Sequence, residues 1–307
     1  MIHLFRTFGL SVCAVLTLLS SRSLGEEHRP AGFAGFDEIF RSPEAFEINL
    51  TGWCVPDVYR GQQPPAPLAH WGHSLLGDIR CDYRNYYTCR TARDLCLGVG
   101  IMAAVANTTC DQKFRDWWQD DVRSSGTDSL ASGFEPFGRG EIFIPAFAGM
   151  AIAGHIFRDR PLGRHCGEFG ERVTRGYLVG APPMLFMQAM LGASRPGVDP
   201  VYDSRWKPFD DNNAVSGHAF MGAVPFLTAA QMTDRPILKG GFLFLSTFPA
   251  WTRINDDAHY LSQACLGWWM AYLACRAVND TQTCNRRFKM LPMTEPDTVG
   301  IQMVWSR

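Results

Sequence analysis

From about residue 91 onwards, long apolar stretches alternate with short connectors that are charged or rich in Pro and Gly. The apolar stretches are rich in Ala, Leu, Met, Phe and Gly and are longer than typical strands, and strict alternation of apolar and polar residues is scarce. This pattern favours helices over strands. Six stretches predict helices: 95–105, 142–157, 177–193, 215–232, 241–251 and 259–277. The expected fold class is therefore all-α, a helical bundle with a six-helix core.

The segment before these stretches has a different composition. Residues 26–90 are rich in Pro, Gly and aromatic residues, with an irregular stretch at 61–67. We expect loops and short helices there, which together form a loop-rich N-terminal extension. The helical domain is predicted over 91–285, and residues 286–307 are expected to be a C-terminal tail.

The apolar stretches are compatible with two environments. Uncharged runs at 176–194 and 258–275 approach the lower limit of a membrane span. Other stretches are shorter, several contain His, Gln or Ser near the middle, and the mean hydropathy of the chain is only −0.09. These features favour helices buried in a bundle, and membrane-embedded helices remain the alternative.

The first 25 residues are typical of a signal peptide. Arg6 supplies a positive charge, residues 8–19 are apolar and uncharged, and small residues precede the polar segment that begins at Glu26. An uncleaved N-terminal anchor is the alternative. Both interpretations predict an exported protein, periplasmic or otherwise extracytoplasmic, which is either soluble or membrane-embedded with its site on the outer side.

Cysteine usage agrees with export, because an oxidising compartment permits disulfides. The chain has 10 cysteines, and without Cys13 of the signal an odd number remains. The cluster Cys81, Cys89, Cys96 and Cys110 is a candidate disulfide region. No Cys-x-x-Cys pair exists, which argues against a zinc knuckle.

Charge and histidine content exclude other classes of function. The net charge of −1 and the lack of basic runs argue against nucleic acid as a partner. His70 and His73 are the nearest approach to a metal-ligand pair, and we interpret them as structural histidines. No metal and no cofactor is predicted.

Three short motifs in the C-terminal half carry the candidate chemistry: Ser194-Arg195-Pro196, Val215-Ser216-Gly217-His218, and Thr252-Arg253 followed by His259. Ser is a strong N-cap, so a helix that begins after Ser216 would offer free N–H groups and its dipole to an anion. Gly217 would allow the anion to approach closely, and His218 would lie in the first turn.

The other two motifs also fall at predicted helix ends. Pro196 stops the third apolar stretch and leaves Arg195 at its C-terminal end. His259 begins the last stretch, and Gln263 lies four residues later on the same helix face. Each motif alone is explained by an ordinary helix cap or a solvated arginine. Together, in this order, they predict three helix ends that meet around one anion.

The three motifs resemble the signature of the type 2 phosphatidic acid phosphatase and vanadium haloperoxidase superfamily. That signature reads Lys-x6-Arg-Pro, then Pro-Ser-Gly-His, then Ser-Arg-x5-His-x3-Asp. The resemblance covers residues 188–263, about a quarter of the chain. It implies an all-α phosphatase-like catalytic domain in 91–285.

The resemblance also implies a role for each matching residue. Arg195 and Arg253 would bind the phosphoryl oxygens, with further hydrogen bonds from Ser216 and Gly217. His259 would be the nucleophile that forms a phosphohistidine, and His218 would be the general acid for the leaving group.

The sequence departs from the signature at four positions. Val215 and Thr252 are mild changes, whereas Gln188 replaces the lysine and Gln263 replaces the aspartate that orients the nucleophilic histidine. Gln263 could still accept a hydrogen bond from His259. As hypotheses, Asp257 or its neighbour Asp256 substitutes for the missing carboxylate. Likewise, Lys207 replaces the missing lysine.

The resulting prediction is a metal-independent phosphoric-ester hydrolase, of the acid phosphatase or phosphatidic acid phosphatase type. Its substrate would be a lipid phosphate, an isoprenoid diphosphate or a small organic phosphate. Two alternatives stay open at this point. One is a vanadate-dependent haloperoxidase, which would need vanadate as cofactor, and the other is a protein that binds a phosphate or lipid without catalysis.

Overall fold

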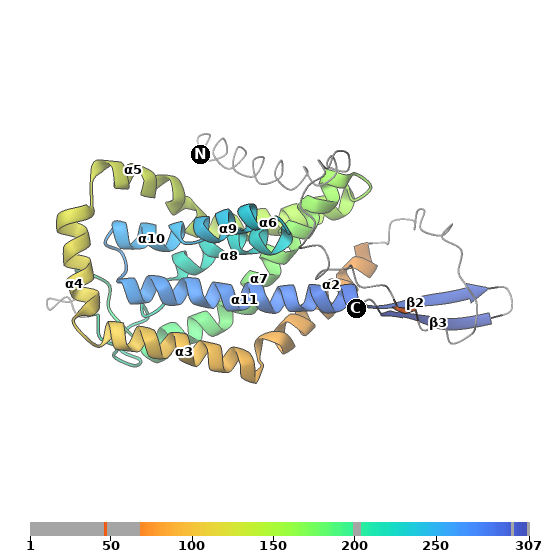
Figure 1. Ribbon diagram of the computed structural model, residues 1–307, viewed down its shortest axis with the longest axis horizontal. Helices are drawn as coiled ribbons and strands as arrows, with labels where there is room; N and C mark the ends of the chain where they lie inside the picture. The colour runs from red at the N-terminus through yellow and green to blue at the C-terminus, as the bar shows by residue number, and fades with distance from the viewer. Residues whose placement is uncertain (1–45, 48–67, 199–203, 296–297, 306–307) are drawn as a thin grey trace, which may run out of the picture.

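The structure is a computed structural model, and it describes residues 46–47, 68–198, 204–295 and 298–305. The predicted signal peptide, Cys54 and the irregular stretch at 61–67 lie outside the described residues. Figure 1 shows a helical bundle with a small sheet projecting from one end. The predicted all-α class is confirmed for the bundle.

The helices follow one another along the chain with short connections. They are α2 (Leu68–Tyr86), α3 (Cys89–Ala106), α4 (Cys110–Trp117), the π-helix η3 (Trp118–Val122), α5 (Ser125–Phe134), the 3-10 helix η4 (Glu135–Gly138), α6 (Gly140–Ile156), α7 (Pro161–Leu191), α8 (Gly217–Met232), α9 (Pro236–Leu245), α10 (Phe248–Asn255) and α11 (Leu261–Arg287).

Most predicted apolar stretches correspond to helices, with differences at their ends. Helices α6 and α8 match their stretches within two residues, whereas α3 begins at Cys89, six residues before its predicted start, α7 begins well before 177 and α11 continues to Arg287. The prediction of one helix over 241–251 is wrong. The chain breaks between α9 and α10, and Pro249 in the first turn of α10 suits the start of a new helix.

The segment predicted as loop-rich contains α2, a helix of 19 residues that packs against α7 and α11. The predicted C-terminal tail also has regular structure. Strands β2 (Phe288–Glu295) and β3 (Thr298–Trp305) pair antiparallel, with Glu295 opposite Thr298. The short strand β1 (Phe46–Glu47) pairs with the other edge of β3, so the sheet order is β1-β3-β2.

Helix α8 forms the centre of the bundle. Nearly all its residues from Ala219 to Ala230 are buried, and it packs against α7, α9, α10 and α11. Its apolar residues lie on every face, as expected of a helix with neighbours on all sides. Because α8 is enclosed in this way, its N-terminus is held at a fixed place at one end of the bundle.

A buried ion pair joins two of the outer helices to each other. Arg175 of α7 and Asp82 of α2 are both fully buried, and Nε and Nη2 of the arginine donate to the two carboxylate oxygens at 2.7 Å. Asp78 and Glu171 each contact the remaining Nη1 at 3.2 Å. The guanidinium is thus fully paired, which is the condition for burying a charge.

The candidate disulfide region does not form bridges in the structure. Cys81, Cys89, Cys96 and Cys110 are all exposed and free. Cys89 and Cys96 lie two turns apart on α3, about 10 Å along the axis, which is beyond the reach of a disulfide. Within the described residues, no helix has both the length and the apolar character needed to cross a membrane.

The buried pair gives a test of the fold. Asp82→Asn leaves the Arg175 charge buried without its bidentate partner, so we expect the free energy of unfolding to fall by about 3–5 kcal/mol. Denaturant melts monitored by circular dichroism measure this. The control is Asp78→Asn, which removes a partly exposed contact to one nitrogen only. Equal losses in the two variants would contradict a dominant role for the buried pair.

Candidate active site

The three motifs lie at one end of the bundle, opposite the end from which the sheet projects (Figure 1). The C-terminus of α7, the N-terminus of α8 and the turn between α10 and α11 all reach this end. The sequence prediction that three helix ends meet is therefore what the structure shows.

One residue, Gln263 in the first turn of α11, forms hydrogen bonds to all three motifs. Its side-chain Nε2 donates to the carbonyl of Ser194 at 2.9 Å. Its backbone carbonyl accepts from the N–H of Ser216 at 2.9 Å. Its side-chain Oε1 lies 2.8 Å from Nδ1 of His259 and also accepts from the backbone N–H of Tyr260. The residue is fully buried, so these bonds fix the segments relative to one another.

This arrangement determines the tautomer of His259. The amide nitrogen of Gln263 already donates to Ser194, so the oxygen must face His259 and can only accept. Nδ1 of His259 therefore carries the hydrogen, and Nε2 has its lone pair free. No described residue hydrogen-bonds this Nε2. A neutral imidazole with an available lone pair is the form that can attack phosphorus.

The surroundings of His259 also keep it neutral. Burial is the main cause that lowers its pKa to about 3, the charges of Arg195, Arg253 and His218 lower it further, and the Gln263 bond partly opposes them. The folded protein therefore resists protonation that the unfolded chain accepts near pH 6.5. It follows that His259 contributes stability above that pH, which is lost as the pH falls towards 3.

The second motif begins α8 as predicted. Ser216 is the N-cap, and its hydroxyl accepts from the N–H of Ala219. The Cα of Gly267 in α11 lies so close to this cap that an added Cβ would come within 2.3 Å of the Ser216 carbonyl. At Gly217 the protein itself leaves ordinary space, with no atom nearer than 3.7 Å to an added Cβ. An anion at the N-terminus of α8 would be favoured by its free N–H groups and by the helix dipole.

Arg253 enters the site from the last turn of α10. Its side chain is largely buried, its Nη1 lies 3.6 Å from Asp256, and its Nε is buried without a hydrogen-bond partner among the described residues. Burial lowers its pKa, and the carboxylates of Asp256 and Glu135 act in the opposite direction. An unpaired buried N–H of a cation costs free energy, and a bound anion would remove that cost.

Arg195 lies beyond the end of α7, on an exposed loop. Its Nε donates to Oδ1 of Asn213 at 2.7 Å, which orients the guanidinium. The loop reverses at Gly192, whose φ of +52° suits glycine and whose Cα packs against the carbonyl of Lys207. The backbone N–H of Lys207 donates to Gly192 in return. The backbone of Lys207 thus lies next to the first motif. That the Lys207 side chain replaces the missing lysine stays a hypothesis.

Gln188 is joined to the second motif by a hydrogen bond. Its Nε2 donates to the carbonyl of Val215 at 2.7 Å, which connects the last turn of α7 to the residue before the N-cap. The family lysine is replaced here by a neutral side chain whose amide is already bonded.

Asp257 is not the carboxylate that orients His259. Its two oxygens bind Nε and Nη2 of Arg115 in α4, at 2.6 and 2.5 Å. The hypothesis that Asp257 replaces the missing aspartate is therefore wrong in this geometry, because Gln263 holds His259 instead. Asp257 has a φ of +53°, so the ion pair stabilises a left-handed residue in the turn between Arg253 and His259.

Residues 177–286 match the family model described as PAP2 superfamily.

The PAP2 segment, residues 177–286, contains all three motifs and the second half of α7 through most of α11. The family resemblance expected from the motifs is thus confirmed over this segment. No curated protein matches the chain. A solved structure that matches is titled the crystal structure of the first transmembrane PAP2 type phosphatidylglycerolphosphate phosphatase from Bacillus subtilis. The two chains share 14% identity with a TM-score of 0.45, over 64% of this chain and 97% of the other.

Residues before the PAP2 segment support its last motif. Gln119 donates to the carbonyl of Ile254, and Trp118 packs against Trp251 and lies within hydrogen-bond distance of Asn255. Both belong to the π-helix η3, a rare element that often occurs near functional sites. The unusual Trp-Trp pair in this segment is the one sequence signal that could have drawn attention to it.

Asp111 at the start of α4 fixes the first turn of α11. Its carboxylate accepts from both the backbone N–H and the hydroxyl of Ser262. Both residues are buried, and burial raises the pKa of Asp111 while the Ser262 bonds lower it. The carboxylate at a helix N-terminus is favourable. It fixes the position of the turn that carries His259.

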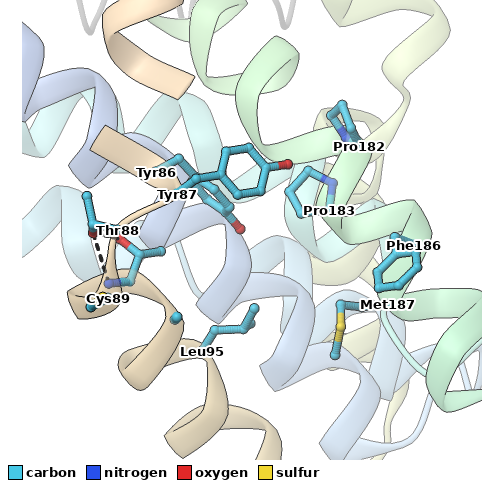
Figure 2. A pocket seen from close by; sticks show the side chains of 11 residues that line it. Tyr86, Tyr87, Thr88, Cys89, Leu95, Pro182, Pro183, Phe186 and Met187 are labelled. Carbon is cyan, nitrogen blue, oxygen red and sulfur yellow. Dashed lines mark hydrogen bonds between the residues drawn. The ribbon is translucent and has the colours of Figure 1, made fainter. Parts of the chain in front are cut away.

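A separate pocket of about 560 Å³ lies between the α2–α3 turn and α7 (Figure 2). Its walls are mainly aromatic and aliphatic, and they include Tyr86, Leu95, Pro183, Phe186 and Met187. None of its lining residues is charged, so it is not the anion site. Among the described residues, no group of three or more His, Cys, Asp and Glu side chains is placed to hold a metal.

The tautomer of His259 is directly testable. Gln263→Leu removes the acceptor of the Nδ1 hydrogen, so we expect the population with the hydrogen on Nε2 to increase. Nitrogen-15 chemical shifts of the labelled histidine distinguish the two forms. Ser262→Ala is the control, because Ser262 is buried beside Gln263 but bonds to Asp111. The same tautomer in wild type and Gln263→Leu would show that another group determines it.

Proposed function

We propose that the protein is a phosphoric-ester hydrolase that forms a phosphohistidine at His259. Membership of the PAP2 segment in its superfamily supports a phosphatase in general terms. The specific support is one observation, the buried Arg253 with an unpartnered Nε close to a neutral His259 that has a free lone pair. A cation with one unpartnered N–H and an imidazole with an unprotonated Nε2 together suit an electrophilic anion such as a phosphoryl group.

The first chemical step uses both histidines. Arg195, Arg253 and the N–H groups at the start of α8 would bind the phosphoryl oxygens. Nε2 of His259 would attack phosphorus in line, so that the N–P bond forms while the ester P–O bond breaks. His218 would give its proton to the departing oxygen, and the products of this step are the alcohol and the phosphohistidine.

The second step reverses the role of His218. A water molecule would attack the phosphohistidine, the N–P bond would break, and His218 would accept a proton from the water. Free phosphate leaves and both histidines return to their starting forms. The Nδ1 hydrogen bond to Gln263 stays in place throughout, because only Nε2 bonds to phosphorus.

The apolar surface favours an amphiphilic substrate. Helix α6 exposes Ile142, Ile144, Ile152 and Ile156, and α9 exposes Ile237 at 88%. Exposed apolar side chains in such number are typical of surfaces that meet lipids or other apolar partners. The pocket of Figure 2 lies between the α2–α3 turn and α7, and its lining residues on α7 are within roughly 9 Å of Gln188 along the helix axis.

We expect His259→Ala to lose roughly 10³-fold or more of kcat/KM on phosphate esters, because the nucleophile is absent. Arg253→Gln should lose about 10²-fold, as for removal of one oxyanion donor. Release of p-nitrophenol from its phosphate ester in the presence of a chelator measures both. His165→Ala, which removes a histidine distant from the motifs, should keep wild-type activity.

Trapping the intermediate distinguishes this mechanism from its alternatives. Acid-labile label from a phosphorus-32 ester should remain on wild-type protein and be absent from His259→Ala. Label on the variant would contradict His259 as nucleophile. Binding of phosphate by the wild type without any turnover would instead indicate the non-catalytic alternative.

The substrate class can be tested by chain length. If the apolar pocket accepts the tail of the substrate, Phe186→Ser should lower kcat/KM about tenfold for a long-chain phosphate ester in mixed micelles, by weakening apolar burial. It should leave glycerol phosphate unchanged. Leu243→Ser, an exposed apolar change on α9 away from the pocket, is the control. An equal loss of kcat/KM on both esters would show that the pocket does not bind the tail of the substrate.

A further inference from the structure

A carboxylate that no motif contains lies next to His218. Oε1 of Glu135, in η4, is 3.5 Å from Nε2 of His218, just too far for a well-formed hydrogen bond. That Nε2 is buried and has no hydrogen-bond partner in the described part of the chain. Glu135 precedes the PAP2 segment and is separated from His218 by 83 positions along the sequence.

Tight packing holds the two groups in this arrangement. Helix η4 packs directly on α8, and an added Cβ on Gly138 would come within 2.2 Å of the His218 ring. The imidazole therefore lies flat against the backbone of the short helix whose first residue is Glu135. Proline at position 136 constrains the backbone of this turn.

Charges from several elements act on the His218 ring. The pKa of His218 is lowered overall, by burial first and then by the charge of Arg253, whereas Glu135 and, more weakly, Glu141 of α6 act against this lowering. His259 also interacts electrostatically with His218, because a charge on His218 lowers the pKa of His259. On its outer side Glu135 pairs with Arg139, at 3.1 and 3.3 Å. Glu135 is thus the nearest group that opposes the loss of the His218 proton.

We propose that Glu135 is a positioning residue for the general acid, and that it holds His218 in the protonated form needed to donate to the leaving group. This inference rests on the proposed function. A protonated imidazole has an N–H on each ring nitrogen, so Glu135 can hold the one on Nε2 while the other is donated. After donation the neutral ring keeps its hydrogen towards Glu135, which prepares it to accept a proton from water.

The proposal explains how the site tolerates glutamine at 263. The nucleophile needs to be neutral, and a neutral amide is enough to orient it. The general acid needs to be charged, and a carboxylate lies beside it. The site therefore has its carboxylate next to the proton donor and its amide next to the nucleophile.

The first test compares two esters in Glu135→Gln, which keeps the shape and the contact with Arg139. An alkyl phosphate needs a proton donor for its leaving group, whereas p-nitrophenyl phosphate hardly does. We expect kcat at pH 7 to fall about tenfold for glycerol phosphate and less than threefold for p-nitrophenyl phosphate. In the pH profile of kcat for the alkyl ester, the fall at high pH should move to lower pH, because His218 loses its proton more readily without the carboxylate.

The second test measures the pKa of His218 in the absence of substrate. In a histidine NMR titration, with the His218 signal identified by its loss in His218→Gln, Glu135→Gln should lower the pKa of His218. Arg139→Gln should raise the pKa of His218, because this change removes the cation that competes with His218 for the Glu135 carboxylate. Glu141→Gln is the matched control. It removes a carboxylate with a weaker effect on His218, so it should lower the pKa of His218 by less.

These outcomes separate the two proposals. A wild-type protein that hydrolyses neither ester would overturn the proposed function, and the NMR titration would still decide the role of Glu135. An unchanged His218 titration in both Glu135→Gln and Arg139→Gln would overturn that role. Equal losses of kcat on the two esters would also overturn that role, because a purely structural effect lowers kcat for both esters alike.

Discussion

Gln263 connects the three motif-bearing segments through its side chain and its backbone carbonyl, and the geometry of the site depends on it. A buried primary amide with unmade hydrogen bonds would destabilise the fold, so the segments around it must supply partners. Ser194 and His259 do so, and the N–H of Ser216 donates to the backbone carbonyl of the same residue, so each motif makes one of these bonds. The same bonds that satisfy the amide determine which nitrogen of His259 carries hydrogen. Stability and chemistry therefore arise from one set of contacts.

The acidic groups around this amide are distributed in a consistent way. Asp257 neutralises Arg115 in the turn before His259, and Asp111 is bonded to Ser262 at the start of α11. Neither carboxylate bonds to the nucleophile. Glu135 lies beside the other histidine. Carboxylates thus support the backbone and lie beside His218, the proposed proton donor, while the direct hydrogen-bond partner of His259, the proposed nucleophile, is a neutral amide. This distribution suits the proposed mechanism, in which the two histidines are in opposite protonation states at the same pH.

The apolar pattern predicted the helical class and the position of α3, α6 and α8 well, because these helices are bounded by clear polar connectors. It failed at 241–251, where an apolar run continues through a break that only Pro249 marks. It also missed α2 and the C-terminal hairpin. Both lie in segments whose composition resembles loops and whose regular structure depends on partners distant in sequence.

The site was predictable to the extent that it lies within short motifs. The N-cap at Ser216 and the pairing of His259 with Gln263 follow from helix spacing alone. The role of Asp257 was predicted wrongly, since its partner Arg115 is 142 positions away. Glu135 was not predicted at all for the same reason. A residue that reaches the site through packing of distant helices leaves no local signal in one sequence.

The bond between Asp111 and Ser262 spans 151 positions, and it fixes the turn that carries the nucleophile. Contacts of such long sequence separation form only after a large loop has closed, which makes them slow and late in folding. The anion site is thus completed together with the bundle as a whole and has no independent existence in any fragment. A ligand that binds it would therefore stabilise the helical bundle against unfolding, since the bound state requires segments from α4 through α11 to be in place at once.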